Sequence, residues 1–151
     1  MWDKTATVAI VVGSGITAGV LCCVALSLVP AFAALPPGEY VRAHRLFGRY
    51  FDRVMPPLVV ATTVVAAVTA ALRWGGPTGS AAAACAGCLF GVSLVSQFGN
   101  VPINRRVKRL DPGAITAAWR DERPAWRRWH LARTGLSLLA LLLAALAAVH
   151  L

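Results

Sequence analysis

Charged residues are scarce in this sequence. Only 14% of its 151 residues are charged and 58% are hydrophobic, whereas about 25% of the residues of an average soluble domain are charged. The charges are also clustered, so that four long windows contain none. Each window exceeds the roughly 17 residues that a membrane-spanning helix needs at minimum. The composition therefore predicts a membrane protein with four spanning helices. The uncharged windows are 5–38, 54–72, 74–104 and 134–151.

Acidic residues are scarcer still. The sequence has 6 Asp and Glu but 15 Lys and Arg, which gives a net charge of +9. The placement of the basic residues argues against a nucleic-acid partner. They gather in two connections, 42–53 and 105–128, whereas only Lys4 precedes the first window and only Arg73 separates the second from the third. Basic loops face the cytoplasm. We therefore expect an inner (plasma) membrane protein with both termini outside, whose basic surplus contacts the lipid bilayer.

The sequence has no nucleotide, flavin or haem motif, and its four cysteines make a weak redox or metal signal. They form the pairs Cys22-Cys23 and Cys85-x-x-Cys88. At 1.5 Å per residue, the first pair lies ~25 Å into its helix and the second only ~9 Å into its own. Since the pairs lie at different depths, we interpret all four as small packing residues.

The expected fold class is all-α, a single four-helix transmembrane domain over residues 1–151. The first window opens with Asp3 and Lys4 rather than a basic cluster, which favours a retained helix over a signal peptide. An amphipathic interfacial helix is expected between the first two spans. The expected spans are about 5–32, 54–73, 79–101 and 130–150, and the expected cytoplasmic segments are 36–53 and 102–129.

The interfacial helix is expected over 39–53, followed by Pro56-Pro57 in the first turn of the second span. Its arginines share one face, and the opposite face carries His44 among apolar residues. Two interpretations of His44 stay open: a histidine that hydrogen-bonds inside the bundle, and a base or ligand at a functional site. The arginine face holds Arg42, Arg45, Arg49 and Arg53, and the His44 face holds Tyr40, Phe47, Gly48, Phe51 and Met55.

The third window ends in a run of amides that is unusual for a membrane helix. Ser93, Gln97, Asn100 and Asn104 follow the spacing of one helix face. Pro102 removes a backbone donor and is expected to disturb the hydrogen-bond ladder nearby. In an alternative interpretation, Asn100 simply caps a new helix that starts at the proline.

A second polar face opens the fourth span, where Trp126, His130, Arg133 and Ser137 repeat the same spacing. The basic connection before it contains one expected short helix, at 114–119. Polar groups that leave water together are best satisfied by one another. We therefore predict that both polar faces and His44 meet near the cytoplasmic face of the membrane. His150, at the outer end, is expected to be inert.

These motifs resemble the anthrone oxygenase-like family of small four-helix membrane proteins, over nearly the whole chain. The specific pieces are Asn100-Val101-Pro102-Ile103-Asn104 and Trp126-x-x-Trp129-His130-x-x-Arg133, supported by His44 and Met55-Pro56. The resemblance implies a membrane-bound monooxygenase that oxidises anthrones to anthraquinones, or a similar electron-rich aromatic, in polyketide-type secondary metabolite biosynthesis. It implies dioxygen as co-substrate and no required cofactor.

An anthrone carries an acidic methylene, so its oxidation needs a base, oxyanion donors and a dry flat pocket. Either His44 or His130 is the expected base, with Arg133 as counter-charge. A metal is the main variant, in which the two histidines and an amide oxygen hold copper or iron. The expected oxyanion donors are Asn100, Asn104 and Gln97, and the expected substrate contacts are Gln97, Tyr40, Phe47, Trp126 and Trp129.

A non-enzymatic class competes with the oxygenase. A small-molecule transporter, or a membrane interaction module with a polar core, would use the same histidines, amides and arginine for an anionic ligand. The sequence leaves the substrate, the metal content and a homo-oligomeric state open.

Overall fold

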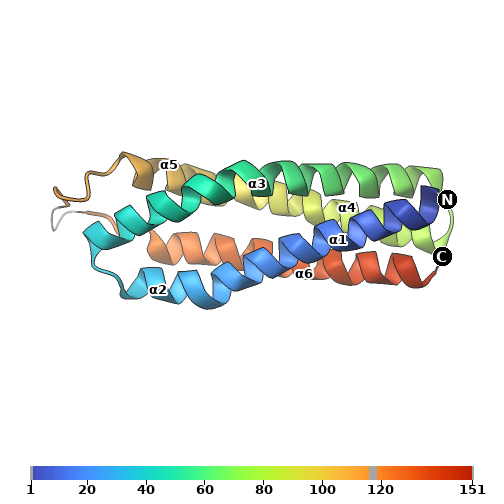
Figure 1. The fold of residues 1–151 in the computed structure, drawn as a ribbon, viewed down its shortest axis with the longest axis horizontal. Coiled ribbons are helices and arrows are strands. Elements are labelled where there is room, and N and C mark those ends of the chain that lie inside the picture. The colour runs from blue at the N-terminus through green and yellow to red at the C-terminus, as the bar shows by residue number, and fades with distance from the viewer. Residues whose placement is uncertain (1, 116–118, 151) are drawn as a thin grey trace.

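The computed structural model describes residues 2–115 and 119–150, and every regular element in these ranges is helical. The elements form four long rods that lie side by side, with the two ends of the chain at the same end of the bundle (Figure 1). The expected all-α four-helix bundle is confirmed. In chain order the rods are α1 (Trp2–Cys23) with η1 (Val24–Leu28) and α2 (Val29–Ala34); α3 (Pro37–Leu72); α4 (Pro77–Val95) with η2 (Ser96–Asn100) and α5 (Val101–Arg109); and α6 (Arg123–Val149).

All four rods are long and apolar enough to cross a membrane. Their packing is typical of a membrane bundle, because small side chains are buried between α4 and α6 while many large apolar side chains are exposed on the outer faces. Alanines of α4 and α6 are fully buried where these two helices approach closely, whereas leucines and valines on the outer faces are exposed. The chain is therefore a multi-pass membrane protein. Examples of buried residues are Ala82, Cys85, Ala140 and Ala144, and of exposed ones Val64, Leu138 and Leu142.

The interfacial helix and the second span form one continuous helix, α3, where the sequence predicted two elements. Pro56 and Pro57 lie inside it rather than in a first turn. Their rings leave the carbonyls of Asp52 and Arg53 without their usual helical donors. Both of these residues are exposed, so the carbonyls can be solvated and the helix continues. The consequence is that His44 is rigidly connected to the transmembrane part of α3.

The third rod also continues beyond its expected end near residue 101, through η2 to Arg109. Asn100 has helical dihedral angles and makes no capping hydrogen bond, so the interpretation of Asn100 as a helix cap is wrong. The π-helical segment η2 ends two residues before Pro102, just as η1 ends two residues before Pro30. In a wider π turn the proline ring avoids the carbonyl four residues earlier, which explains why both rods pass their prolines unbroken.

The bundle end opposite the termini is closed by Arg123. Its Nη1 donates to the carbonyls of Phe32 (3.0 Å) and Leu35 (2.8 Å), and its guanidinium lies 5.4 Å from the centre of the Tyr40 ring. It also pairs with Asp121 and holds the pKa of that carboxyl below its ordinary value. Arg123 thus ties α6 to the α2–α3 turn. The short helix expected at 114–119 includes residues 116–118, which lie outside the described residues.

Candidate active site

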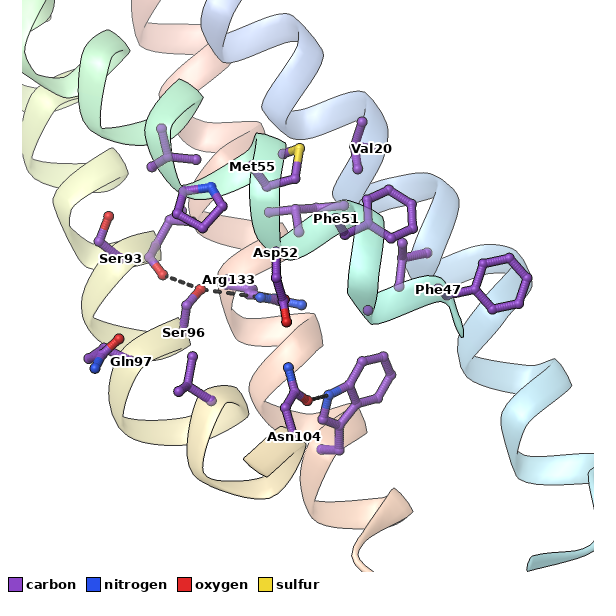
Figure 2. A pocket seen from close by; sticks show the side chains of 18 of the residues that line it. Val20, Phe47, Phe51, Asp52, Met55, Ser93, Ser96, Gln97, Asn104 and Arg133 are labelled. Atoms are coloured by element: carbon purple, nitrogen blue, oxygen red, sulfur yellow. Dashed lines mark hydrogen bonds between the residues drawn. The ribbon is translucent and has the colours of Figure 1, made fainter. Parts of the chain in front are cut away.

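A cavity of about 490 Å³ lies between the four rods, towards the end that Arg123 closes. Its walls are largely apolar, and both π-helical segments contribute to them. A cavity of this size and character is typical of small-molecule sites. Figure 2 shows side chains of α3, η2, α5 and α6 pointing into it. The polar residues that line it are His44, Asp52, Ser93, Ser96, Gln97, Asn104 and Arg133, together with the indole of Trp126.

Asn104 connects α3 and α6 through one oxygen atom. Its Oδ1 lies 2.9 Å from Nε1 of Trp126 and 3.1 Å from Nε2 of His44. An indole nitrogen can only donate, so the shared atom must be an acceptor. Nε2 of His44 therefore carries the proton, and in the neutral ring Nδ1 keeps its lone pair. Among the described residues, this buried Nδ1 has no hydrogen-bond partner.

Aromatic rings surround His44 and keep it dry. Its ring centre lies 5.8 Å from that of Phe32, 5.4 Å from that of Tyr40 and 5.7 Å from that of Trp126. Only 4% of His44 is exposed. His44 belongs to the cavity lining, and the unshared lone pair of its buried Nδ1 is shielded from water.

His130 lies on the other side of Trp126, stacked on its indole at 5.2 Å with an angle of 12° between the planes. It is fully buried and does not line the cavity. Its Nε2 lies 3.0 Å from the carbonyl of Leu21, and its Nδ1 accepts from Arg133, with Nε at 3.1 Å and Nη2 at 2.8 Å. Both ring nitrogens are thus occupied, with the proton on Nε2.

Arg133 reaches the cavity from α6 and is fixed on two sides. Besides its bonds to His130, its Nη1 donates to Oγ of Ser96 at 3.2 Å, as Figure 2 shows. Ser96 in turn donates to the carbonyl of Val92 at 2.7 Å. The guanidinium is held by neutral groups only.

Asn100 has a positioning role. It is completely buried outside the cavity, and its Nδ2 donates to the carbonyl of Trp126 at 3.1 Å. One residue earlier, Gly99 leaves room for the ring of Trp129, which would collide with a Cβ at that position. These two contacts fix η2 against the start of α6.

The structure brings some of the sequence-predicted residues to the cavity and places others behind it. Trp129 is 45% exposed and packs on Gly99, away from the lining. Tyr40, Asn100 and His130 are buried behind the first layer. The predicted residues that do line the cavity are His44, Phe47, Gln97, Asn104, Trp126 and Arg133.

Sequence reasoning missed Ser96, Asp52 and the carbonyl of Leu21. Ser96 lies three residues after Ser93 and four before Asn100, so helical spacing contained a signal for it. Asp52 is an acidic residue next to Phe51 on α3, and it forms an ion pair with Lys108. A main-chain carbonyl such as that of Leu21 has no signal in the sequence.

The two histidines do not fit the predicted copper or iron pair in this arrangement. A metal ligand must offer a lone pair, and that of His130 is directed at the Arg133 guanidinium. Among the residues that the structure describes, no group of three or more His, Cys, Asp and Glu side chains could hold a metal ion.

Comparison with known proteins gives one match. A family model described as anthrone oxygenase matches residues 43–143, about two thirds of the chain. The matched segment contains every polar residue that lines the cavity. No curated protein and no solved structure matches the chain.

Proposed function

Because the chain belongs to the anthrone oxygenase family, we propose that it is a membrane oxygenase that uses dioxygen to oxidise an anthrone-type aromatic ketone. Family membership supports an oxygenase in general. The substrate, its place in an aromatic polyketide-type pathway and the absence of a further cofactor are our proposals. So are the plasma membrane location, the outward termini and a site near the cytoplasmic face.

The proposed reaction begins with His44. Its Nδ1 takes one proton from the acidic methylene, which leaves an electron-rich enolate, and Nε2 stays bonded to Asn104. The enolate passes one electron to dioxygen, and the resulting radical and superoxide combine to form a carbon–oxygen bond. The peroxide anion takes back the proton. His44 then removes the second hydrogen from the same carbon while the O–O bond breaks, so that the ketone becomes a quinone and one water molecule leaves.

Asn104 contributes twice to this scheme. Its oxygen orients His44, and its amide nitrogen forms no hydrogen bond with other described residues. Figure 2 shows this nitrogen on the side away from the indole, where it can donate to the enolate oxygen. Phe47 and Trp126 line the same cavity and suit a flat ring system. The apolar walls keep the reactive enolate from water.

The observation that carries this proposal is that His44 lines the cavity while its buried Nδ1 has no hydrogen-bond partner among the described residues. The lone pair of this Nδ1 supports His44 as the general base, which a cofactor-free oxidation needs in order to remove a proton from carbon.

The test is dioxygen uptake by the purified protein in lipid nanodiscs with an anthrone, corrected for the spontaneous oxidation seen with empty nanodiscs. We expect one dioxygen consumed per quinone formed, with no hydrogen peroxide. A rate equal to that of empty nanodiscs would contradict the proposal. Tight anthrone binding without uptake would instead favour the transporter or interaction module, which the positive charge of Arg133 in an apolar cavity also suits.

A further inference from the structure

We propose that Arg133 is an anion-binding group that takes a negatively charged oxygen of the ligand, and that His130 is the residue that positions it. The inference rests on the proposed function for the aromatic nature of the ligand. It adds that the ligand must carry an ionisable hydroxyl, a phenol or enol, that binds as its anion. This requirement can be tested by binding alone.

No carboxylate of the described residues is bound directly to Arg133. Among the described residues its guanidinium forms no ion pair, and its partners are a neutral histidine and a serine hydroxyl. A charge inside a membrane span is costly and is normally paired. Since Arg133 lines the cavity, a negatively charged group of what the cavity binds can pair with it directly.

Asp52 is the acidic residue on the cavity wall, and it does not fill this role. Its carboxylate is bound to Nζ of Lys108, and its side chain is 49% exposed. The Asp52 carboxylate acts on Arg133 through its charge, but its hydrogen bond goes to Lys108, so it occupies no N–H group of Arg133.

The donors of Arg133 leave room for a ligand oxygen. A guanidinium has five N–H groups. Nε and Nη2 share Nδ1 of His130, and Nη1 serves Ser96, so one N–H on each terminal nitrogen stays free. The amide nitrogen of Asn104, in the same lining, adds a further donor. These N–H groups and the amide are donors for an anionic oxygen, and hydrogen bonds from a charged donor to such an oxygen are strong.

His130 determines the direction of Arg133. The Leu21 carbonyl fixes the proton of His130 on Nε2, which leaves Nδ1 as an acceptor aimed at the guanidinium. Stacking on Trp126 prevents the ring from turning. His130 therefore acts through Arg133 and touches no ligand in the cavity itself.

The experiment measures binding of a hydroxyanthraquinone and of its methyl ether, which are fully oxidised and cannot turn over. Dissociation constants come from tryptophan fluorescence quenching in nanodiscs, corrected for partition into protein-free nanodiscs. We expect the wild type to prefer the hydroxyl compound by roughly 10- to 100-fold, the range expected for hydrogen bonds to a charged group. Arg133→Gln should lose this preference and bind the ether as before. The exposed Arg128 on the same helix is the matched control, and Arg128→Gln should keep the preference.

A wild type without the preference, an Arg133→Gln variant that keeps it, or an Arg128→Gln variant that loses it equally would overturn the proposal. These outcomes concern binding only. Whether the protein takes up dioxygen with an anthrone is measured separately, so failure of the inference and failure of the proposed function are distinguishable.

The role of His130 is tested by two substitutions. His130→Phe keeps the stack on Trp126 and removes the acceptor, so the preference should fall at least severalfold. His130→Asn restores an acceptor near the position of Nδ1 and should recover part of it. A merely structural role would weaken both ligands equally in both variants, and that result would contradict positioning through Arg133. The Arg133→Gln result stands even if a His130 variant fails to fold.

Discussion

Asn104 and Trp126 are joined by a hydrogen bond of 2.9 Å from the indole Nε1 to the amide Oδ1. This bond fixes the orientation of the amide, and thereby decides which nitrogen of His44 carries its proton. The position of the proton on His44 is thus set by residues that lie on other rods of the bundle.

Replacement of Trp126 by phenylalanine tests this relationship. The phenyl ring keeps an aromatic surface for His130 and His44 but cannot donate to Asn104, so the amide can flip and the His44 tautomer is no longer fixed. We expect about a tenfold lower turnover, the effect of one lost hydrogen bond. Initial rates of anthrone oxidation measure it. Trp129→Phe, on the exposed side, should leave the rate unchanged, and an equal loss in both variants would argue against the mechanism.

The contact between η2 and α6 gives a prediction on stability. A Cβ on Gly99 would lie 2.5 Å from ring atoms of Trp129, whereas one on Gly87 of α4 would meet nothing within 4 Å. Gly99→Ala should therefore cost about 1–3 kcal/mol through overpacking, and Gly87→Ala should be neutral or slightly stabilising. Thermal unfolding in detergent compares them. If Gly99→Ala is as stable as Gly87→Ala, the packing described for Trp129 is wrong.

The cysteines are predicted to be dispensable. All four are free thiols, and Cys85 is buried in the alanine-rich interface with its Sγ 3.8 Å from Oγ of Ser14. Simultaneous replacement of all four by alanine should leave dioxygen uptake unchanged and lower the unfolding temperature only modestly. Loss of activity in a variant that still folds would show that a thiol takes part in the chemistry.

The orientation in the membrane is predicted from the loop charges. Arginines and lysines concentrate at the bundle end opposite the termini (Figure 1), and such ends face the cytoplasm. Reporter fusions at the C-terminus should therefore be active only in a reporter that works outside the cytoplasm. Activity of a cytoplasmic reporter at that position would reverse the topology.

The sequence predicted the bundle well because lack of charge and helix length determine where a chain can cross a membrane. It also identified Asn104, Trp126 and His44, whose helical spacing and depth bring them together. It failed where the backbone departs from an α-helix. The π-helical segment η2 takes more residues per turn, so the face predicted from α-helical spacing shifts. Asn100 turns behind the cavity and Ser96, which was not predicted, faces Arg133.

The continuity of α3 could not be predicted for a related reason. A pair of prolines usually marks a helix start, whereas here the helix continues through them, at a place where Asp52 and Arg53 are exposed. The hydrogen bond from His130 to the Leu21 carbonyl could not be predicted either. Every residue has a main-chain carbonyl, so the sequence does not show which one of a distant helix will face His130.

The most direct test of the central claim, that His44 is the base, is the initial rate of anthrone-dependent dioxygen uptake by His44→Ala. Loss of a general base costs about 10²–10⁴-fold, and we expect a loss in this range with an unchanged helical content. His150→Ala is the matched control, because the described contact of His150 uses its backbone carbonyl only, and it should keep the full rate. A folded His44→Ala variant that oxidises the anthrone at the wild-type rate would contradict the account.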